Sequence, residues 1–404
     1  MRSRLFDILM GCLVFVSGGR ADDWPQFRGP NRDGISAEKN WLDHWPNQGP
    51  AILWTGHTGL GFSSVVVGSG RLFTLGHADE MDTVYCFEAL TGKSLWKYSY
   101  PSELGDKFYE GGVTGTPTID GDRVFVLNRW GDLFCFEAAS GKIVWQRNIQ
   151  TEEKIRLPDW GFSGAPVVHE NMLLLNVGQS GMALDKSSGK TLWLSQDKDC
   201  GYSTPLPMQR EGRWFALFSS REGYSCADLA TGKELWRMKW LTQYGLNAAQ
   251  PIPKDDLIFI SSGYGKGAAV FRPHGQDQPE VLWQNKNLRT QFNSAVLIGD
   301  FLYGVDGDTT QKAALKCIEF KSGEQKWAEP GIGSGGLTVA DGKLIVLTAT
   351  GELIVAPATE KGFVPTARAQ VIGGKCWTVP VLANGTVYCR NSRGDIAAVD
   401  LRKK

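Results

Sequence analysis

Short runs of β-branched, aliphatic and aromatic residues alternate with glycine-containing turns along nearly the whole chain. Apolar runs joined by Asp-Gly or Ser-Gly turns are typical of antiparallel hairpins. Helical periodicity is absent throughout, so the pattern predicts an all-β protein. One clear unit has predicted strands at 116–119, 123–127, 133–136 and 143–145.

A single phrase recurs along the chain: a small residue, an acidic residue two positions later, a Thr/Ser-Gly turn and a closing tryptophan. The tryptophans are 42 to 49 residues apart, which is the repeat length of a four-stranded propeller blade. The phrase ends, in complete or partial copies, at Trp54, Trp96, Trp145, Trp193, Trp236, Trp283 and Trp327. The turn glycines of the complete copies are Gly92, Gly141, Gly189, Gly232 and Gly323.

The two ends of the chain complete one blade. Residues 367–371 mark the last strand of a further unit that lacks its tryptophan, and three predicted strands follow at 378–382, 386–389 and 396–399. The strand at 52–54, which ends at Trp54, has no three strands before it. Pairing it with the C-terminal strands closes the ring and removes the open sheet edges. We therefore predict an eight-bladed β-propeller over residues 51–404.

The first residues resemble an export signal. Arg2 and Arg4 supply positive charge, residues 8–16 form a short apolar core, and Ala21 stands at a cleavage position. Residues 1–21 are therefore predicted to be a signal peptide, which gives a periplasmic or extracellular protein. The alternative is a short tether or a misassigned start.

Stable attachment to a membrane is not expected. The residues around Cys12 loosely resemble a lipoprotein box, but more apolar sequence follows where a mature chain would begin, so lipid anchoring is not predicted. No other apolar run approaches the ~20 residues that cross a bilayer.

The charges balance, with 43 Lys and Arg against 43 Asp and Glu. Nucleic-acid binders and polybasic membrane-surface proteins depend on an excess of positive charge, so neither class is expected. A charged fraction of 21% and an apolar fraction of 42% are typical of a globular protein.

The cysteines are predicted to fill the core. Four of them occupy one repeat position, six residues before the turn glycine: Cys86, Cys135, Cys226 and Cys317. Ala183 takes the same place in a fifth copy. These positions lie in different blades, so they cannot converge on one metal ion, and no Cys-x-x-Cys spacing occurs. A pair that involves Cys200, Cys376 or Cys389 is the alternative.

Residues 22–50 precede the propeller. Their aromatic content predicts an extension that packs on the ring, while a partner-binding arm is the alternative. The aromatic side chains are Trp24, Phe27, Trp41 and Trp45.

The repeated phrase resembles that of propellers of the pyrroloquinoline quinone (PQQ) type, over residues from about 51 to 401. This family includes quinoprotein alcohol dehydrogenases and non-catalytic members such as the outer-membrane assembly lipoprotein BamB. The resemblance implies that each repeat tryptophan packs between neighbouring blades, near the glycine of the preceding turn. It is specific for the fold and weak for function, because enzymes and scaffolds share the repeat.

Loops at one end of the channel carry the candidate binding residues. Aromatic side chains beside arginines can stack on and pair with a planar anionic ligand such as PQQ. A hydrated polar rim that binds nothing is the alternative. The candidates are Arg129, Trp130, Trp160, Arg221, Trp377 and Arg393, among loops that also carry Tyr109, Glu110, Asp159, Glu222, Asn247, Arg289, Asn293 and Asp308.

No catalytic or metal-binding residue is assigned. PQQ chemistry needs a Ca²⁺ ion held by carboxylate and amide oxygens and an Asp base. The resemblance to the dehydrogenases also implies an adjacent cysteine pair, which this sequence lacks. The five histidines share no metal-ligand spacing, and the glycines at 331–336 are followed by a strand where a phosphate-binding helix would begin.

The sequence therefore predicts a monomeric, exported, non-catalytic propeller that binds a protein or an envelope polymer. A PQQ-dependent dehydrogenase with Ca²⁺ is the first alternative. A subunit of outer-membrane protein assembly similar to BamB is the second.

Overall fold

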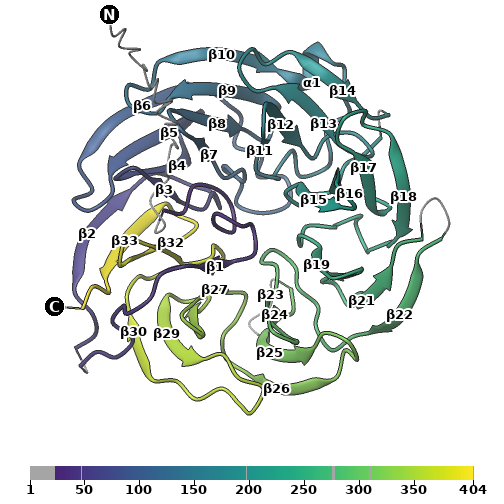
Figure 1. Ribbon diagram of the computed structural model, residues 1–404. Helices are drawn as coiled ribbons and strands as arrows, with labels where there is room; N and C mark the ends of the chain where they lie inside the picture. Colours follow the sequence, from purple (N-terminus) through teal and green to yellow (C-terminus); the bar gives the residue numbers. More distant parts are fainter. Residues whose placement is uncertain (1–22, 47, 197, 275–277, 309–311, 404) are drawn as a thin grey trace, which may run out of the picture.

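Eight four-stranded antiparallel sheets stand around a central channel, as the repeat count predicts (Figure 1). The structure, a computed structural model, describes residues 23–46, 48–196, 198–274, 278–308 and 312–403. The expected signal peptide at 1–21 lies outside the described residues. In blades 1 to 6 the strands are neighbours in chain order, and the first strand lies nearest the channel. In blade 7 a short N-terminal strand is added on the channel side, and in blade 8 an N-terminal strand is the outermost of the four.

Blades 1 to 4 follow one another along the chain, each with four consecutive strands. Blade 1 comprises β3 (Val66–Gly68), β4 (Arg71–Ala78), β5 (Met81–Glu88) and β6 (Ser94–Pro101). Blade 2 comprises β7 (Thr118–Asp120), β8 (Arg123–Leu127), β9 (Asp132–Glu137) and β10 (Ile143–Asn148). Blade 3 comprises β11 (Val167–His169), β12 (Met172–Leu175), β13 (Met182–Asp185) and β14 (Thr191–Leu194). Blade 4 comprises β15 (Leu206–Arg210), β16 (Arg213–Ser220), β17 (Gly223–Asp228) and β18 (Glu234–Lys239).

Blades 5 to 8 complete the ring. Blade 5 comprises β19 (Ile252–Lys254), β20 (Leu257–Ser262), β21 (Gly267–Arg272) and β22 (Glu280–Asn285). Blade 6 comprises β23 (Val296–Ile298), β24 (Phe301–Asp306), β25 (Ala314–Glu319) and β26 (Gln325–Glu329). Blade 7 comprises β27 (Gly336–Ala340), β28 (Lys343–Leu347), β29 (Glu352–Pro357) and β30 (Ala367–Gln370), with β1 (Ile35–Ser36) added inside β27. Blade 8 comprises β31 (Val381–Ala383), β32 (Thr386–Arg390), β33 (Asp395–Asp400) and β2 (Ile52–His57).

Two details differ from the sequence pattern. The innermost strands of blades 2 and 8 begin at Thr118 and Val381, because the residues before them turn toward the channel. One short helix, α1 (Ile149–Glu152), follows β10, and it is capped by the Asn148 side chain, which accepts from Thr151 N–H at 2.9 Å. A single helical turn is too short to produce a periodic pattern.

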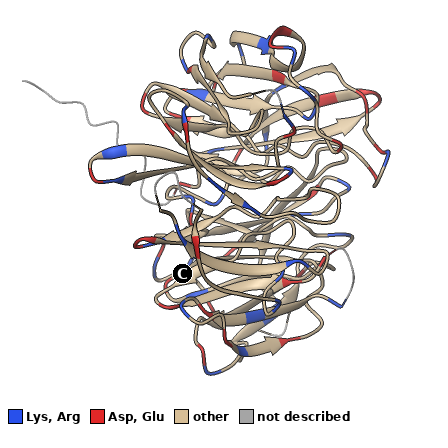
Figure 2. Cartoon of the chain, turned by 90° about the vertical axis from the view of Figure 1, so that its right-hand side faces the viewer, with Lys and Arg blue, Asp and Glu red and all other residues tan. Residues whose placement is uncertain are grey.

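The ring closes as predicted, through pairing of the chain ends. β2 runs antiparallel to β33, with Trp54 opposite Ala398 and His57 opposite Asp395. Blade 8 thereby combines one strand from the N-terminal part with three from the C-terminal part. The charged side chains are mixed in sign over the edge of the ring (Figure 2).

Each repeat tryptophan packs on the next blade along the ring. The indole of Trp145 covers Gly189, where an added Cβ would lie 2.8 Å from Trp145 Cε3, and Trp145 Nε1 donates to Lys186 O at 3.0 Å. The same contact joins Trp54 to Gly92, Trp96 to Gly141, Trp193 to Gly232 and Trp283 to Gly323. The expectation that the partner is the preceding glycine of the same blade is wrong, because that glycine receives the tryptophan of the previous blade.

Blade 7 has no repeat tryptophan, and the N-terminal extension replaces it. Trp41, which is 4% exposed, lies in the cluster between blades 7 and 8 with Leu353 and Val387. Leu42 N–H donates to Leu401 O at 2.6 Å, and Trp45 Nε1 donates to the backbone of β30 at 3.1 Å. All eight interfaces between blades therefore contain an indole.

The rest of the extension enters the central channel (Figure 1). Trp24 forms a backbone bridge with Val67 of β3, and β1 pairs in parallel with β27. Between them, the buried guanidinium of Arg28 donates to the carbonyl oxygens of Ser294 (3.1 Å) and Ala295 (2.9 Å), and burial lowers the pKa of Arg28 to about 10. The extension thus ties blades 1, 6 and 7 together across the channel.

The cysteines are buried thiols. All seven in the described part of the chain are free, including the four at the shared repeat position. Burial raises the pKa of Cys135 and Cys200 to about 12. Among these same residues, no helix combines the length and the apolar character needed to cross a membrane.

Replacing Trp145 with Ala is expected to lower the free energy of unfolding by roughly 3–5 kcal/mol, because it empties the space between blades 2 and 3. Chemical denaturation followed by circular dichroism measures the change. Val144→Ala is the control, since this neighbour on the same strand is 40% exposed. Equal effects of the two substitutions would contradict the interface role.

Trp41→Ala is expected to destabilise the ring by a similar amount, roughly 3–5 kcal/mol, although Trp41 lies outside the repeats. The same denaturation experiment tests this, with the exposed Lys39→Ala as control. A loss below about 1 kcal/mol would show that the extension does not support the interface between blades 7 and 8.

Candidate functional site

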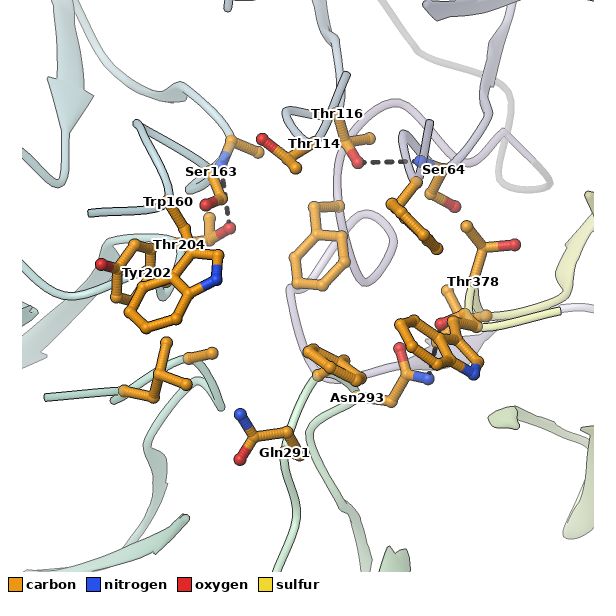
Figure 3. Close-up of a pocket in the computed structure, with 18 of the residues that line it drawn as sticks. Ser64, Thr114, Thr116, Trp160, Ser163, Tyr202, Thr204, Gln291, Asn293 and Thr378 are labelled. Atoms are coloured by element: carbon orange, nitrogen blue, oxygen red, sulfur yellow. Dashed lines mark hydrogen bonds between the residues drawn. The ribbon is translucent and has the colours of Figure 1, made fainter. Parts of the chain in front are cut away.

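A cavity of about 240 Å³ lies where the channel opens among the loops that lead into the innermost strands. Seven blades line it, each through residues just before or beside its innermost strand, and Phe27 of the extension lines it as well. Because the extension fills the adjoining part of the channel, the cavity is closed on that side. Figure 3 shows Ser64, Thr116, Thr204 and Thr378 around its edge.

The lining is aromatic and uncharged. All 21 lining residues belong to the described part of the chain, and none of them is Lys, Arg, His, Asp or Glu. The aromatic members are Phe27, Phe62, Phe108, Tyr109, Trp160, Tyr202, Tyr264, Phe292 and Trp377. The polar members are Ser64, Thr114, Thr116, Ser163, Thr204, Gln291, Asn293 and Thr378.

Stacked rings form one wall. Trp377 lies between Phe62 and Phe292, with ring centroids 5.3 and 4.9 Å away and interplanar angles of 23° and 19°. Asn293 holds this stack in place, because its Nδ2 donates to Trp377 O at 2.8 Å. The Trp377 ring is therefore oriented by neighbours on both faces and by its own backbone.

Trp160 forms the opposite wall, across the cavity from Thr378 (Figure 3). Its ring centroid is 4.9 Å from that of Phe108 and 5.9 Å from that of Tyr202. Beyond it, Tyr244 packs edge-on against Tyr264 at 5.3 Å. The two aromatic walls leave a slot between them.

The hydroxyl groups of the cavity join neighbouring blades. Thr116 Oγ1 accepts the Ser64 N–H at 3.1 Å, and Thr204 Oγ1 accepts the Ala165 N–H at 3.0 Å (Figure 3). A hydroxyl that accepts a bond still has its own proton to donate. These threonines can therefore hold the ring together and bind a ligand at once.

Gln291 has an unpaired donor at the cavity. The side chain is 5% exposed, and its Oε1 accepts the Gly263 N–H at 3.1 Å, which fixes the orientation of the amide. Its Nε2 is buried and has no hydrogen-bond partner within the described chain, and Figure 3 shows the amide directed into the cavity. A buried donor without a partner is costly, and a bound ligand can remove that cost.

The candidate arginines do not line the cavity. Arg129 is 4% exposed, and its guanidinium donates to the carbonyl oxygens of Leu104, Gly105 and Trp160 at 3.0 Å. These bonds consume the charged donors that were expected to pair with an anion. Arg129 therefore supports the loop at 102–112 and the backbone of Trp160.

The other predicted residues separate into two groups. Trp160 and Trp377 line the cavity, as do Tyr109 and Asn293 from the wider set of loop residues. Trp130, Arg221 and Arg393 do not. Arg221 pairs with Asp159 at 3.1 Å, Trp130 Nε1 donates to Glu103 O at 2.9 Å, and Arg393 is exposed.

The sequence pattern did not identify Gln291, Phe62 or Tyr202 as residues that line the cavity. The repeated turns at 61–63 and 201–203 were a usable signal, because they recur where the chain leads into an innermost strand. Gln291 has no such signal, since it lies outside any repeated phrase and its role depends on the bond from Gly263.

An ion pair lies behind the Trp377 wall. Lys375 Nζ is 2.5 Å from Glu110 Oε1 and 4.4 Å from the centroid of the Trp377 ring. Partial burial opposes ionisation of Glu110, but the hydrogen bond and charge of Lys375 outweigh it, so the pKa of Glu110 lies below its ordinary value. The pair leaves this wall without net charge.

The cavity does not fit PQQ held on Ca²⁺. The cofactor is a planar polycarboxylate that requires cationic partners, and the ion requires hard oxygen ligands. The lining offers neither a cationic side chain nor a carboxylate, and within residues 23–403, outside the stated gaps, no group of three or more His, Cys, Asp or Glu could hold a metal ion.

Replacing Glu110 with Gln is expected to lower the melting temperature at neutral pH and to have little effect in acid. Because the folded pKa of Glu110 is lowered, its stabilisation is present above the unfolded value, 4.5, and is lost as the pH falls through the folded value. Thermal unfolding of both proteins across this range measures the gap. A gap of constant size would contradict the ion pair as its cause.

Comparisons with known proteins support the fold. The model of the family described as outer membrane protein assembly factor BamB matches residues 80–329. BamB from Moraxella catarrhalis superposes with a TM-score of 0.61 at 15% identity, over 88% of this chain and 98% of that chain. Quinohemoprotein alcohol dehydrogenase ADHIIG from Pseudomonas putida HK5 gives 0.66 at 13% identity, over 94% and 80%.

A europium-containing methanol dehydrogenase gives a TM-score of 0.67 at 12% identity, over 94% of this chain and 91% of that chain. Identities this low show the shared fold alone. No curated protein gives a significant match to the sequence. The family match covers more than half of the chain, and the protein therefore belongs to the family of outer membrane protein assembly factor BamB, with its PQQ-like propeller repeats.

Proposed function

We propose that the protein is an exported, non-catalytic propeller that works as a binding module of the cell envelope, with the channel cavity as its ligand site. The signal-like residues 1–21 support export. The family name, which refers to outer membrane protein assembly, supports a place in the envelope. The expected partner is a protein or an envelope polymer, bound by a monomer.

The uncharged aromatic cavity is the observation that carries this proposal. Concave, mostly apolar sites with a few placed polar groups are typical of ligand-binding sites. Here nine aromatic side chains line the cavity together with Gln291, whose amide donor is buried and unpaired within the described chain. A hydroxyl nucleophile needs an adjacent base to activate it, and the lining residues supply hydroxyl and amide groups without a carboxylate, imidazole, amine or thiol beside them.

A second candidate, a subunit of protein assembly similar to BamB, is favoured by exposed apolar side chains beside the cavity. Phe108 and Tyr244 are 51% and 52% exposed, and the rings of both pack against Trp160, with centroids 4.9 and 6.4 Å away. Exposed aromatic residues of this kind are enriched at protein interfaces. This candidate predicts copurification with outer-membrane assembly proteins.

A matched pair of dyes tests the ligand site. Residues 22–404 are expected to bind neutral N-phenylnaphthylamine, with enhanced dye fluorescence, and to bind anilinonaphthalene sulfonate at least about tenfold more weakly, because the cavity cannot pair the sulfonate. Trp160→Ala should abolish the enhancement. The control is Trp214→Ala, which removes a partly exposed indole, 37% accessible, from blade 4.

Titration with PQQ and Ca²⁺ tests the non-catalytic part of the proposal. Neither saturable quenching of tryptophan fluorescence nor PQQ-dependent reduction of a redox dye by alcohols is expected. Saturable binding at micromolar concentrations together with dye reduction would replace the proposal with a quinoprotein dehydrogenase.

A further inference from the structure

Three features of the cavity indicate its ligand class. Its walls are flat and aromatic, its lining carries no charge, and hydrogen-bond donors are present inside it. The argument rests on the proposed function, because it deepens the assignment of this cavity as a ligand site. Each feature excludes a different group of ligands.

The walls select a flat ligand. Trp160 is only partly buried, and its ring neighbours Phe108 and Tyr202 are tilted by 40° and 84°, so a face of its indole stays open to the slot. The faces of Trp377 are covered by Phe62 and Phe292, so its stack forms the wall that limits the width of the slot. Aromatic faces carry partial negative charge and attract polarised C–H groups or ring edges. Planar rings and the C–H faces of pyranose sugars both meet this requirement.

The charge of the lining selects a neutral ligand. An ionised group that leaves water for this slot would find no countercharge among the lining residues, and an unpaired buried charge is strongly unfavourable. Lys375, the nearest cation behind the Trp377 wall, is already paired with Glu110 at 2.5 Å. Carboxylated and phosphorylated ligands are thereby disfavoured.

The polar groups select a ligand that bears hydroxyls. Gln291 Nε2 requires an acceptor, and the hydroxyls of Thr116 and Thr204 have protons to donate after accepting backbone N–H groups. A purely apolar ring would leave the Gln291 donor unpaired, which is unfavourable. A sugar hydroxyl both accepts and donates, so it satisfies these groups together.

The depth of the cavity selects one end of a chain. The extension closes the channel on the side of Phe27, so a polymer cannot thread through. The volume of about 240 Å³ is below the ~300–1,000 Å³ of typical small-molecule sites. We infer that the cavity binds the terminal pyranose ring of a neutral glycan, which stacks on the open face of Trp160 and accepts a hydrogen bond from Gln291.

Isothermal titration calorimetry of residues 22–404 with cellobiose, maltose and chitobiose tests the inference. At least one disaccharide is expected to bind with a millimolar or lower Kd and to displace N-phenylnaphthylamine. Its pentasaccharide should bind within about threefold of this value, since only the end enters. The corresponding disaccharide that ends in a uronic acid should bind at least about tenfold more weakly.

Variants locate the binding. Trp160→Ala and Gln291→Met should each weaken saccharide binding about tenfold or more, Trp160→Phe should weaken it less, and Trp214→Ala should leave it unchanged. Because Gln291→Met also removes the acceptor for Gly263 N–H, its melting temperature is measured in parallel. If that variant unfolds, the partly exposed Trp160 series decides.

The outcomes separate the inference from the proposed function. Dye binding without binding of any saccharide overturns the glycan assignment and leaves the ligand site intact. Displacement of the dye by a neutral tripeptide but by no saccharide also overturns it, in favour of a protein ligand. Saccharide binding that is unchanged in Trp160→Ala places the glycan outside the cavity and overturns the inference. If the native protein binds neither the dye nor any saccharide, both the inference and the proposed function are contradicted.

Discussion

The indole of one blade lies on the bare backbone of a glycine in the next, and the ring depends on this contact. The glycines have φ values of 69° to 73°, a region that favours glycine, and an added Cβ would fall 2.5 to 2.8 Å from the indole of Trp54, Trp96, Trp145, Trp193 or Trp283. Each contact fixes the distance and the angle between two blades. Repetition of one local geometry therefore sets the diameter of the channel.

That diameter gives the binding residues their positions. The turns that lead into the innermost strands are brought together at one end of the channel, so side chains such as Phe62 and Tyr202, which come from different blades, reach the same cavity. The threonines at this level bridge neighbouring blades through backbone N–H groups. The same residues that complete the ring thus provide the polar part of the lining.

The repeats made the fold predictable, because the tryptophan spacing, the turn glycines and the unpaired strand at Trp54 are all local signals that the structure repeats. The site was predictable only in part. Aromatic residues on the right loops, Trp160 and Trp377, do line the cavity. Arg129 does not, since its guanidinium is used by carbonyl groups of a loop whose path has no sequence signature. Trp41 was expected to pack on the ring, but its role as the missing eighth indole depends on a contact between distant parts of the chain.

The order of synthesis gives this last contact a further meaning. Trp41 and Trp54 emerge from the ribosome early, whereas their partners, blade 7 and strand β33, are made last. Closing contacts between residues so far apart in sequence is slow, and the early aromatic segment stays uncovered until it happens. During most of its synthesis the chain therefore exposes an aromatic, aggregation-prone N-terminal segment. A chaperone that binds this segment would therefore act before blades 7 and 8 have been synthesised. In a chain truncated within its last blade, the segment would lack part of the surface on which it packs.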